Sequence, residues 1–345
     1  MNANIISFLS TRGRKMNIDL KIVQDYLASA LPDVTFKYYF KNNATKVPAV
    51  NQQLGNARVS FCEDAKNLLC MDASIPIRMA PATSEEKRLL TLAPYDYLFK
   101  EYLKYRENPE SEHKKTFIQC THIIPGAPFF SKFLKDFYVL DNTVLLDDLC
   151  LPFSWDIMQE PQKAKFRNNF EYFYPQAKGK KILSVITVNQ KATDEINDLF
   201  SDFDLTKLLD QLKNDWFLIT NNVNLLEMAA SLSFEYADCF GYMKDRFNVN
   251  NLLYFSDILV TNSSKHACAF ASVKKPVYYL NYGSKYFGTY IKQFYPDLYL
   301  NTAGELMKIN YEKPLLSDEQ QKFCQDFCYH TTKNPLEEIR NIYTE

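Results

Sequence analysis

The sequence predicts an α/β protein made of two doubly wound, Rossmann-like halves. Short apolar runs of strand length alternate with amphipathic segments of helical period along most of the chain. A basic, turn-rich segment at residues 175–181 interrupts this alternation near the middle. The chain has 345 residues, whereas single hydrophobic cores stop growing beyond about 250 to 300 residues. Two domains of the same class are therefore expected.

The first half is expected to open as a βαβ unit. Its first helix carries Asp19 near the N-cap, where an acidic side chain can accept from free backbone N–H groups. The expected elements are strands at 5–9, 34–40, 67–72 and 116–120, helices at 19–31 and 95–105, and one or two strands within 137–146. Strands that alternate with helices in this way indicate a parallel sheet.

The second half repeats the alternation after a polar, helical segment at 159–174. Strands are expected at 182–186, 216–220, 252–261 and 275–280, and helices at 204–213, 223–232 and 266–273. Ser317, with Gln320 three residues later, has the spacing of a capping box. It predicts a terminal helix that continues past Cys324 and Cys328.

These patterns predict four parts of the chain. They are an N-terminal, acceptor-side α/β domain (1–158), a linker (159–175), a C-terminal nucleotide-donor α/β domain (176–316), and a C-terminal helix (317–345) that packs back towards the first domain. Two doubly wound domains in this order describe a glycosyltransferase-B type architecture. The cleft that such domains face is then the expected binding site.

Composition excludes several classes of protein. The net charge is -1, with 40 basic and 41 acidic side chains, so no overall field attracts nucleic acid. The eight Cys form no CxxC pair and only four His are present, which disfavours a metal site and favours reduced, mostly buried thiols in a cytoplasmic protein. No window approaches 18 uninterrupted apolar residues, and no secretory signal precedes the first strand. Neither a secreted nor a membrane-spanning protein is expected.

Asn262, Ser263 and Ser264 follow the strand expected at 252–261 and precede a helix-compatible segment. In open α/β sheets ligands bind at the carboxyl ends of strands, and a helix N-terminus offers N–H groups to a phosphate. The same residues would cap the helix in any case. A phosphate-bearing donor is therefore expected at this point.

The block from Leu252 to Tyr286 resembles the C-terminal signature of the CDP-glycerol:poly(glycerophosphate) glycerophosphotransferase family, the teichoic-acid primases and polymerases. That family reads there as S-D-I-L-I-T-D-Y-S-S, F-D-F-A, a K/R-P-I strand and Y-D-x-x-x-Y. Asn262 stands in place of the family Asp, and Ser264 in place of its first Ser. The matching residues are Asp257, Ile258, Leu259, Thr261, Phe270, Ala271, Lys275, Pro276, Tyr282 and Tyr286.

A fainter likeness lies in the first half. Residues 118–122 are similar to the family's I-Q-x-x-H-G, whose His is regarded as the catalytic base, so the resemblance implies that role for His122. Because His122 follows the strand expected at 116–120, it is expected on the carboxyl-end rim of the sheet. The alternative is a His hydrogen-bonded locally in a loop.

The departures from the family pattern are informative. The family's second-half His-Pro falls near Thr220-Asn221-Asn222, Ile123 replaces the Gly after the first-half His, and Phe153 replaces an Arg. Asn221 and Asn222 can still donate a hydrogen bond to a donor phosphate, but an amide carries neither charge nor a titratable proton. The donor or the chemistry has shifted, or activity is lost.

Two further groups of charged residues could form sites. Arg12, Arg14 and Lys15 follow the first strand and would suit an anionic acceptor, although solvated surface charge is the commoner explanation. Asp147 and Asp148 form an acidic pair, but the architecture requires no metal and none is expected.

The resemblance implies a transferase that moves glycerol phosphate, or a related polyol phosphate, from a CDP-activated donor to a cell-surface glycan or lipid-linked acceptor, without a cofactor. The first alternative is a glycosyltransferase of the same architecture that uses a nucleotide sugar. The second is a non-catalytic binding subunit of such a pathway. Any membrane association is expected to be peripheral and electrostatic, at the inner face of the cell membrane.

Overall fold

The computed structural model divides into two compact units, and each is described by itself. Unit 1 comprises Met1–Ala93, Tyr105–Asp156 and Asp326–Glu345, and unit 2 comprises Pro94–Lys104 and Ile157–Gln325. The structure describes residues 5–10, 17–40, 67–70, 86–92, 94, 96–107, 115–116, 120–140, 143–188, 199–200, 202–232, 234–243, 247–282, 284–329 and 331–344.

Unit 1 contains a six-stranded sheet in the order β2-β1-β3-β4-β6-β8. Every neighbouring pair is parallel. The strands are β1 (Ile5–Ser10), β2 (Thr35–Phe40), β3 (Asn67–Cys70), β4 (Lys87–Thr91), β6 (His122–Ile124) and β8 (Val144–Leu145); β5 (Lys115–Thr116) and β7 (Tyr138–Val139) form a separate two-stranded sheet.

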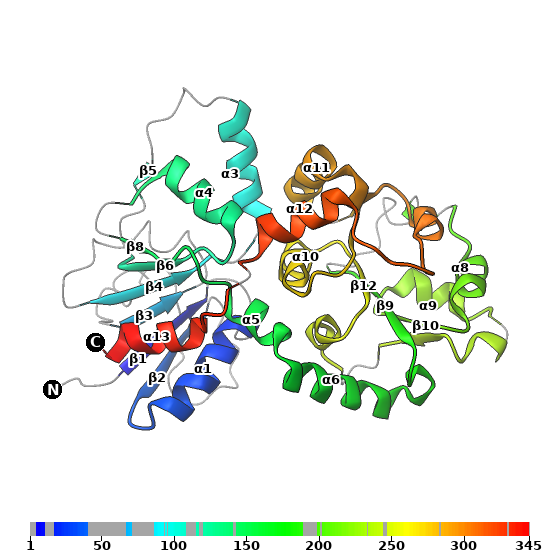
Figure 1. Ribbon diagram of the computed structural model, residues 1–345, viewed down its shortest axis with the longest axis horizontal. Coiled ribbons are helices and arrows are strands. Elements are labelled where there is room, and N and C mark those ends of the chain that lie inside the picture. Colours follow the sequence, from blue (N-terminus) through cyan, green and yellow to red (C-terminus); the bar gives the residue numbers. More distant parts are fainter. Residues whose placement is uncertain are drawn as a thin grey trace. The chain divides into compact units, whose positions relative to one another are not determined.

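The helices of unit 1 include α1 (Ile18–Ala30), α4 (Pro128–Phe137) and α13 (Pro335–Thr344). α13, at the C-terminal end of the chain, packs against α1 (Figure 1). Leu89 and Leu90 of β4 and Ile6 and Phe8 of β1 are almost completely buried. Strands buried on both faces are typical of parallel sheets.

Unit 2 contains a second parallel six-stranded sheet, in the order β11-β10-β9-β12-β13-β14. The strands are β9 (Lys181–Ile186), β10 (Trp216–Thr220), β11 (Phe240–Tyr242), β12 (Ile258–Thr261), β13 (Val277–Leu280) and β14 (Tyr299–Leu300). The α-helices are α6 (Glu160–Phe173), α8 (Leu205–Leu212), α9 (Val223–Ala229), α10 (Ser264–Phe270) and α11 (Lys285–Phe294). The 3₁₀-helices are η2 (Pro175–Ala177), η3 (Phe234–Tyr236), η4 (Val249–Tyr254), η5 (Ala271–Val273), η6 (Pro296–Leu298) and η7 (Ala303–Lys308).

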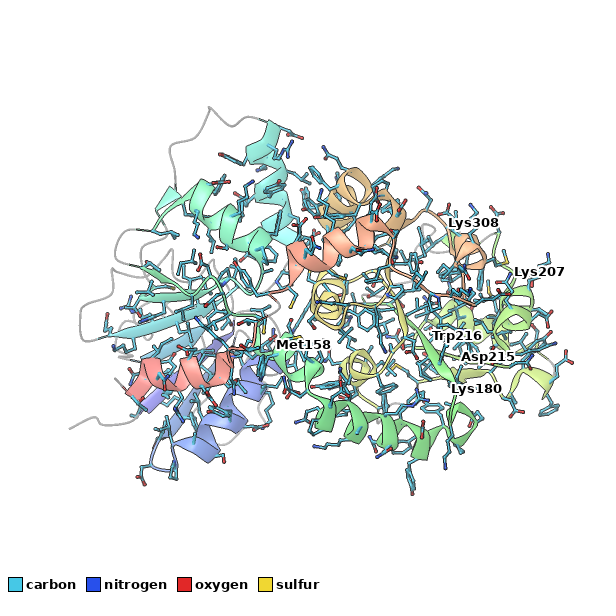
Figure 2. The ribbon with its side chains drawn as sticks, in the orientation of Figure 1. Met158, Lys180, Lys207, Asp215, Trp216 and Lys308 are labelled. Atoms are coloured by element: carbon cyan, nitrogen blue, oxygen red, sulfur yellow. The ribbon has the colours of Figure 1, made fainter. Side chains whose placement is uncertain are left out.

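Trp216 anchors the core of unit 2 at the start of β10, next to Asp215 in the chain (Figure 2). Its indole N–H donates to the carbonyl of Tyr311 at 3.1 Å, and the two rings meet edge to face with centroids 5.6 Å apart. Leu208, Leu209 and Leu212 line the buried face of α8 in the same cluster. Their spacing is the helical period that predicted this helix.

Three helices contain a boundary between the units: α3 (Asp96–Glu107), α5 (Pro152–Met158) and α12 (Asp318–Phe327). The first part of α3 belongs to unit 2. There Asp96 accepts hydrogen bonds from the backbone N–H groups of Tyr286 and Phe287 at 3.1 and 2.8 Å, which caps α11. Phe99 packs on Phe287 and Tyr290, with ring centroids 4.7 and 5.2 Å away.

The division into 1–158, 159–175, 176–316 and 317–345 stays a prediction. The segment Pro94–Lys104, expected in the first domain, clusters with unit 2. The segment expected to be a linker contains α6, and Phe170 of this helix is buried against Phe217 and Phe255 within unit 2. A helix that buries an aromatic side chain is part of its domain.

Several expected elements of the first half need correction. The strand expected at 116–120 is wrong in its end, because Cys120 lies outside any strand. In this part of the chain the strand that joins the large sheet is β6, which begins at His122. β4 and α4 were not expected. Asn17, two residues before Asp19, caps α1 by accepting from the Asp19 N–H at 3.1 Å. The Asp19 carboxylate instead accepts from the N–H of Phe153 at 2.9 Å.

In the second half, the strand expected at 252–261 is shorter than predicted. Leu252, Leu253 and Tyr254 belong to the 3₁₀-helix η4, and only Ile258–Thr261 form β12. The helix start at Ser317 is confirmed, because its hydroxyl accepts from the N–H of Gln320 at 3.3 Å. The reciprocal bond of a capping box is missing, because the buried side-chain oxygen of Gln320 has no hydrogen-bond partner. The helix ends at Phe327, before Cys328, and α13 follows as a separate helix.

Among the residues whose side chains the structure describes, the cysteines are free and buried, as predicted: Cys120, Cys150, Cys239, Cys268, Cys324 and Cys328. Burial raises the pKa of the Cys150 thiol to about 12, so it is unreactive at neutral pH. No helix in the described part of the chain is long and apolar enough to cross a membrane.

Candidate functional site

The carboxyl ends of three adjacent strands in unit 2 gather the polar residues predicted to bind the donor. β10, β9 and β12 are neighbours in that order and run parallel, so their carboxyl ends lie along one edge of the sheet. Thr187 and Val188 directly follow β9, Asn221 and Asn222 follow β10, and Asn262 and Ser263 follow β12. The sequence thus predicted correctly that these Asn and Ser residues lie at strand ends.

Two of these asparagines bind the segment after β9 from both sides. Asn221 accepts from the N–H of Thr187 and donates to its carbonyl, both at 2.9 Å. Asn262 accepts from the N–H of Val188 at 2.8 Å and donates to its carbonyl at 3.0 Å. These side chains bind backbone in the structure, and direct phosphate binding by them stays a prediction.

Asn222 and Ser263 cap the two helices that follow. Asn222 accepts from the N–H of Leu225 at 3.1 Å at the start of α9, and its amide donates to the Thr187 hydroxyl at 3.2 Å. Ser263 accepts from the N–H of His266 at 3.4 Å at the start of α10. The capping role that the sequence allowed for Ser263 is confirmed, whereas capping by Asn222 was not predicted.

Ser264 has a different partner from the one predicted. Its buried hydroxyl donates to the carbonyl of Pro94 at 2.6 Å, within unit 2. A hydroxyl has one hydrogen to donate, and a phosphate oxygen can only accept. Phosphate binding by the Ser264 hydroxyl therefore requires the bond to Pro94 to break, and this role stays a prediction.

His266 is a buried, neutral histidine next to this edge. Its Nε2 lies 3.0 Å from the Asn250 side-chain oxygen, which places the ring hydrogen on Nε2, and its Nδ1 is buried without a partner. Burial is the main cause that lowers the pKa of His266 to about 3. Protonated His266 is thus disfavoured in the folded state.

We expect His266 to make unit 2 sensitive to acid. The unfolded chain binds a proton at this residue near pH 6.5, whereas the folded chain does so only near pH 3, so the free energy of unfolding falls by about 1.4 kcal/mol per pH unit below 6.5. Urea unfolding at pH 6.5 and 4.5 should therefore show a loss about 2 to 3 kcal/mol smaller in His266→Gln than in the wild type. Equal losses in both proteins would contradict this account.

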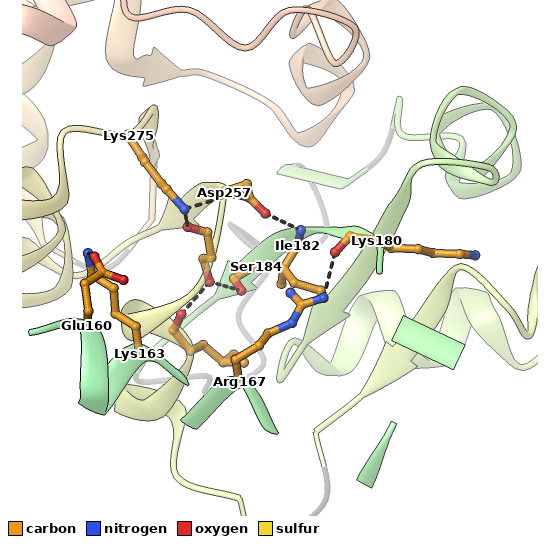
Figure 3. A network of polar contacts seen from close by, with 10 residues as sticks. Glu160, Lys163, Arg167, Lys180, Ile182, Ser184, Asp257 and Lys275 are labelled. Atoms are coloured by element: carbon orange, nitrogen blue, oxygen red, sulfur yellow. Dashed lines mark hydrogen bonds and ion pairs between the residues drawn. The ribbon is translucent and has the colours of Figure 1, made fainter. Parts of the chain in front are cut away.

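Two matches to the family signature lie at the opposite, amino-end edge of the sheet (Figure 3). Asp257 accepts from the N–H of Ile182 at 2.9 Å and pairs with Lys275 at 2.9 Å. Lys275 also donates to the carbonyl of Ser256 at 3.0 Å. These contacts join the starts of β9, β12 and β13, so Asp257 and Lys275 match the family at positions that support the sheet.

His122 occupies a different place from the one predicted. It is the first residue of β6 and pairs with Leu89 and Val144, and the two residues before it, Cys120 and Thr121, lie outside any strand. At about 3.3 Å per residue, its Cα lies roughly 7 Å before the carboxyl end of the strand at Ile124. The sequence predicted it on the rim because His122 closely follows the strand expected at 116–120.

His122 contacts the hydroxyl of Thr121 through Nδ1. The Thr121 hydroxyl accepts from the N–H of Arg88 at 2.9 Å and donates to the Arg88 carbonyl at 3.2 Å. Its oxygen also lies 2.9 Å from Nδ1 of His122. In the tautomer that donates from Nδ1 to this hydroxyl, the basic lone pair lies on Nε2.

The other predicted residues fall into two groups. Arg12, Arg14 and Lys15 lie outside the described residues. Asp147 forms an ion pair with Lys135 and Asp148 with Lys333, so both carboxylates have cationic partners. Among the described residues, no group of three or more His, Cys, Asp and Glu could hold a metal ion.

The sequence missed Thr187, Pro94 and Asp96 as parts of this region. Thr187 directly follows the buried strand β9, and a polar residue in that position is a recognisable signal for a binding edge. Pro94 and Asp96 had no such signal, because their partners are 170 and 190 residues away in the chain.

Comparison with known proteins supports a family assignment. Residues 100–341 match the family model described as CDP-Glycerol:Poly(glycerophosphate) glycerophosphotransferase. A teichoic acid poly(ribitol-phosphate) polymerase of Bacillus spizizenii is 24% identical over 221 residues, which are 62% of this chain and 35% of the polymerase. The chain thus spans about a third of the length of this curated relative.

Solved structures show the same fold. The wall teichoic acid polymerase TagF aligns with a TM-score of 0.65 and 14% identity over 99% of this chain and 88% of the other. The lipopolysaccharide glycosyltransferase WaaG aligns with a TM-score of 0.50 and 11% identity over 99% of each chain. A UDP-GlcNAc 2-epimerase from Neisseria meningitidis aligns with a TM-score of 0.56 and 11% identity over 99% of each chain. The predicted fold class, two doubly wound α/β domains of glycosyltransferase-B type, is confirmed.

Proposed function

Because this chain belongs to the CDP-glycerol:poly(glycerophosphate) glycerophosphotransferase family, we propose that it transfers a polyol phosphate from a CDP-activated donor. Glycerol phosphate is the first expected group, and the acceptor is a hydroxyl of a cell-surface glycan or a lipid-linked precursor. The observation that carries the proposal is the family match over residues 100–341. It includes His122 and the whole carboxyl-end edge of the unit 2 sheet.

The similar proteins support a CDP-linked polyol as the donor. The Bacillus relative is named as a polymerase of ribitol phosphate, and one TagF structure is of a variant soaked with CDPG. A donor of this kind carries a diphosphate, which suits an edge rich in backbone N–H groups and amides.

In the proposed reaction His122 acts as the general base. Nε2 takes the proton from the acceptor hydroxyl, whose oxygen attacks the β-phosphorus of the donor. The bond from that oxygen to phosphorus forms while the bond to CMP breaks, and CMP leaves with the electron pair. The reaction needs no covalent intermediate with the protein.

One observation favours a second candidate, a non-catalytic subunit that binds the donor. Asn221 and Asn222 stand near the position of the family's second-half His-Pro, and their side chains bind the Thr187 backbone and cap α9. An amide takes up no proton at neutral pH, so neither residue replaces that histidine as an acid or a base. Donor binding without turnover is the outcome that distinguishes this candidate.

Thermal unfolding with a series of nucleotides tests the proposal. CDP-glycerol or CDP-ribitol at 100 times its Kd should stabilise the folded chain by about 2.7 kcal/mol, because only the native state binds it. CMP and UDP-GlcNAc serve as comparisons, and release of CMP in the presence of a polyol-phosphate acceptor reports turnover. Stabilisation by UDP-sugars alone would replace the proposal with the nucleotide-sugar transferase.

We further propose that the protein acts in the cytoplasm, where its contact with the membrane is peripheral and electrostatic through basic residues such as Arg12, Arg14 and Lys15. Each basic residue near an anionic surface contributes about 1 kcal/mol, and salt screens this attraction. Sedimentation with anionic vesicles should therefore decrease steeply between 50 and about 500 mM salt. Retention on the vesicles at high salt and alkaline pH would exclude this mode of binding.

A further inference from the structure

The segment after β9 is held in an uncommon way. β9 lies between β10 and β12 in the sheet, and its next two residues, Thr187 and Val188, continue past the end of the strand. Asn221 directly follows β10 and Asn262 directly follows β12, and each binds both the N–H and the carbonyl of one of these residues at 2.8 to 3.0 Å. We name Asn221 and Asn262 the amide clamp. It continues the hydrogen bonding of the sheet beyond the strands.

Each clamp position requires a side chain that donates and accepts at the same time. A carboxamide does both with adjacent atoms, whereas an ionised carboxylate only accepts. Aspartate at position 262, the residue of the family pattern, would lose the bond to the Val188 carbonyl and place negative charge against its oxygen. The clamp thus accounts for an asparagine where the family has an acid.

We propose that Asn221 and Asn262 are positioning residues for the donor. Their amides keep the backbone of Thr187 and Val188 in one conformation, so that the donor meets an ordered edge of the unit 2 sheet. A third bond helps to fix this backbone conformation, because the amide of Asn222 donates to the Thr187 hydroxyl at 3.2 Å. Both of these side chains are buried. The inference rests on the proposed function, because it concerns the same donor.

Removing either amide should weaken donor binding without affecting the chemical step. A residue that becomes free must be ordered again on binding, so Asn221→Ala and Asn262→Ala should each raise the Kd and KM for CDP-glycerol about tenfold, while kcat changes less than about threefold. Asn262→Asp should also bind CDP-glycerol more weakly than the wild type, although it restores the family residue. Hydrogen exchange should accelerate at the Thr187 amide in Asn221→Ala and at the Val188 amide in Asn262→Ala.

Asn310→Ala is the matched control. Asn310 also accepts from a backbone N–H in unit 2, that of Lys313 at 3.1 Å, but it adjoins Tyr311, whose carbonyl binds Trp216 at the amino end of β10. The Kd of the Asn310→Ala variant for CDP-glycerol should equal that of the wild type. All measurements are made at 15 °C, where the far-UV circular dichroism of each variant verifies that it is folded.

The outcomes separate the two proposals. A wild-type protein that binds no CDP-glycerol overturns the proposed function, and the role of the clamp in donor binding with it. Wild-type binding with an unchanged Kd in the Asn221→Ala and Asn262→Ala variants overturns the clamp alone. A lower melting temperature with an unchanged Kd would mean that the amides only stabilise the fold, and tighter binding by Asn262→Asp would likewise exclude the proposal.

Discussion

Replacing His122 with alanine is expected to lower turnover about 100- to 10,000-fold, while the affinity for the CDP-activated donor stays nearly unchanged. The base removes its proton only as the reaction proceeds, so its loss affects the transition state and not donor binding. Stopped assays of CMP release, together with the Kd for CDP-glycerol, measure both quantities. Among the described residues His266 is the other histidine, and its burial makes it unsuitable as a base.

The pH profile provides the control for His122. Wild-type turnover should fall at acid pH, because a protonated imidazole cannot act as a base, and the remaining activity of His122→Ala should lack this pH dependence. A variant with wild-type turnover would remove His122 from the mechanism. If only the melting temperature falls, the imidazole acts as a structural partner of Thr121.

Gly126→Ala is expected to cost about 4 kcal/mol of stability in unit 1. Gly126 has a φ of +77°, and a Cβ there would lie 2.4 Å from Cγ of Leu151. The left-handed conformation costs a non-glycine residue roughly 1 to 2 kcal/mol, and forcing an added methyl group into packed atoms typically costs a further 1 to 3 kcal/mol. Because this glycine shapes the loop between β6 and α4, the change should also disturb the end of the strand that begins at His122.

Gly179→Ala is a matched control for the packing part of this effect. Gly179 has the same φ of +77°, but an added Cβ would meet no atom within 4 Å. Its substitution should therefore cost only the conformational part, about 1 to 2 kcal/mol. Guanidinium unfolding followed by circular dichroism compares the two variants. Equal losses of stability would show that Leu151 can move aside.

Local patterns predicted most of the unit 2 elements. The strand expected at 216–220 is confirmed with the same bounds, and the helix expected at 204–213 is confirmed with Asp204 as its cap. Here an apolar run and a 3.6-residue period coincide with buried faces. β4 was missed because it begins with the charged residues Lys87 and Arg88. Arg88 is 3% exposed and forms an ion pair with Glu86 at 2.8 Å. A search of the sequence for apolar runs does not detect a buried strand that contains such a pair.

The position of His122 shows why a motif alone was insufficient. In the sequence, residues 116–120 and 122–124 both have strand character, and only pairing with distant partners shows that His122 begins a strand. β6 pairs with Leu89 and Val144, which shifts His122 from the carboxyl end of a strand to its beginning. A displacement of a few residues therefore changes which edge of the sheet a candidate base approaches.

The sequence by itself determined the α/β class, the family likeness and the polar residues at the strand ends of unit 2. These features are encoded locally, in periodicity, in caps and in short motifs. Only the tertiary structure decided which groups those residues bind. It assigned the start of α3 to unit 2 through Asp96 and Phe99, and it directed the amides of Asn221 and Asn262 to the backbone after β9. The physical reason is that these contacts join residues 34 to 191 positions apart, and their formation depends on the packing of whole elements, which no local pattern records.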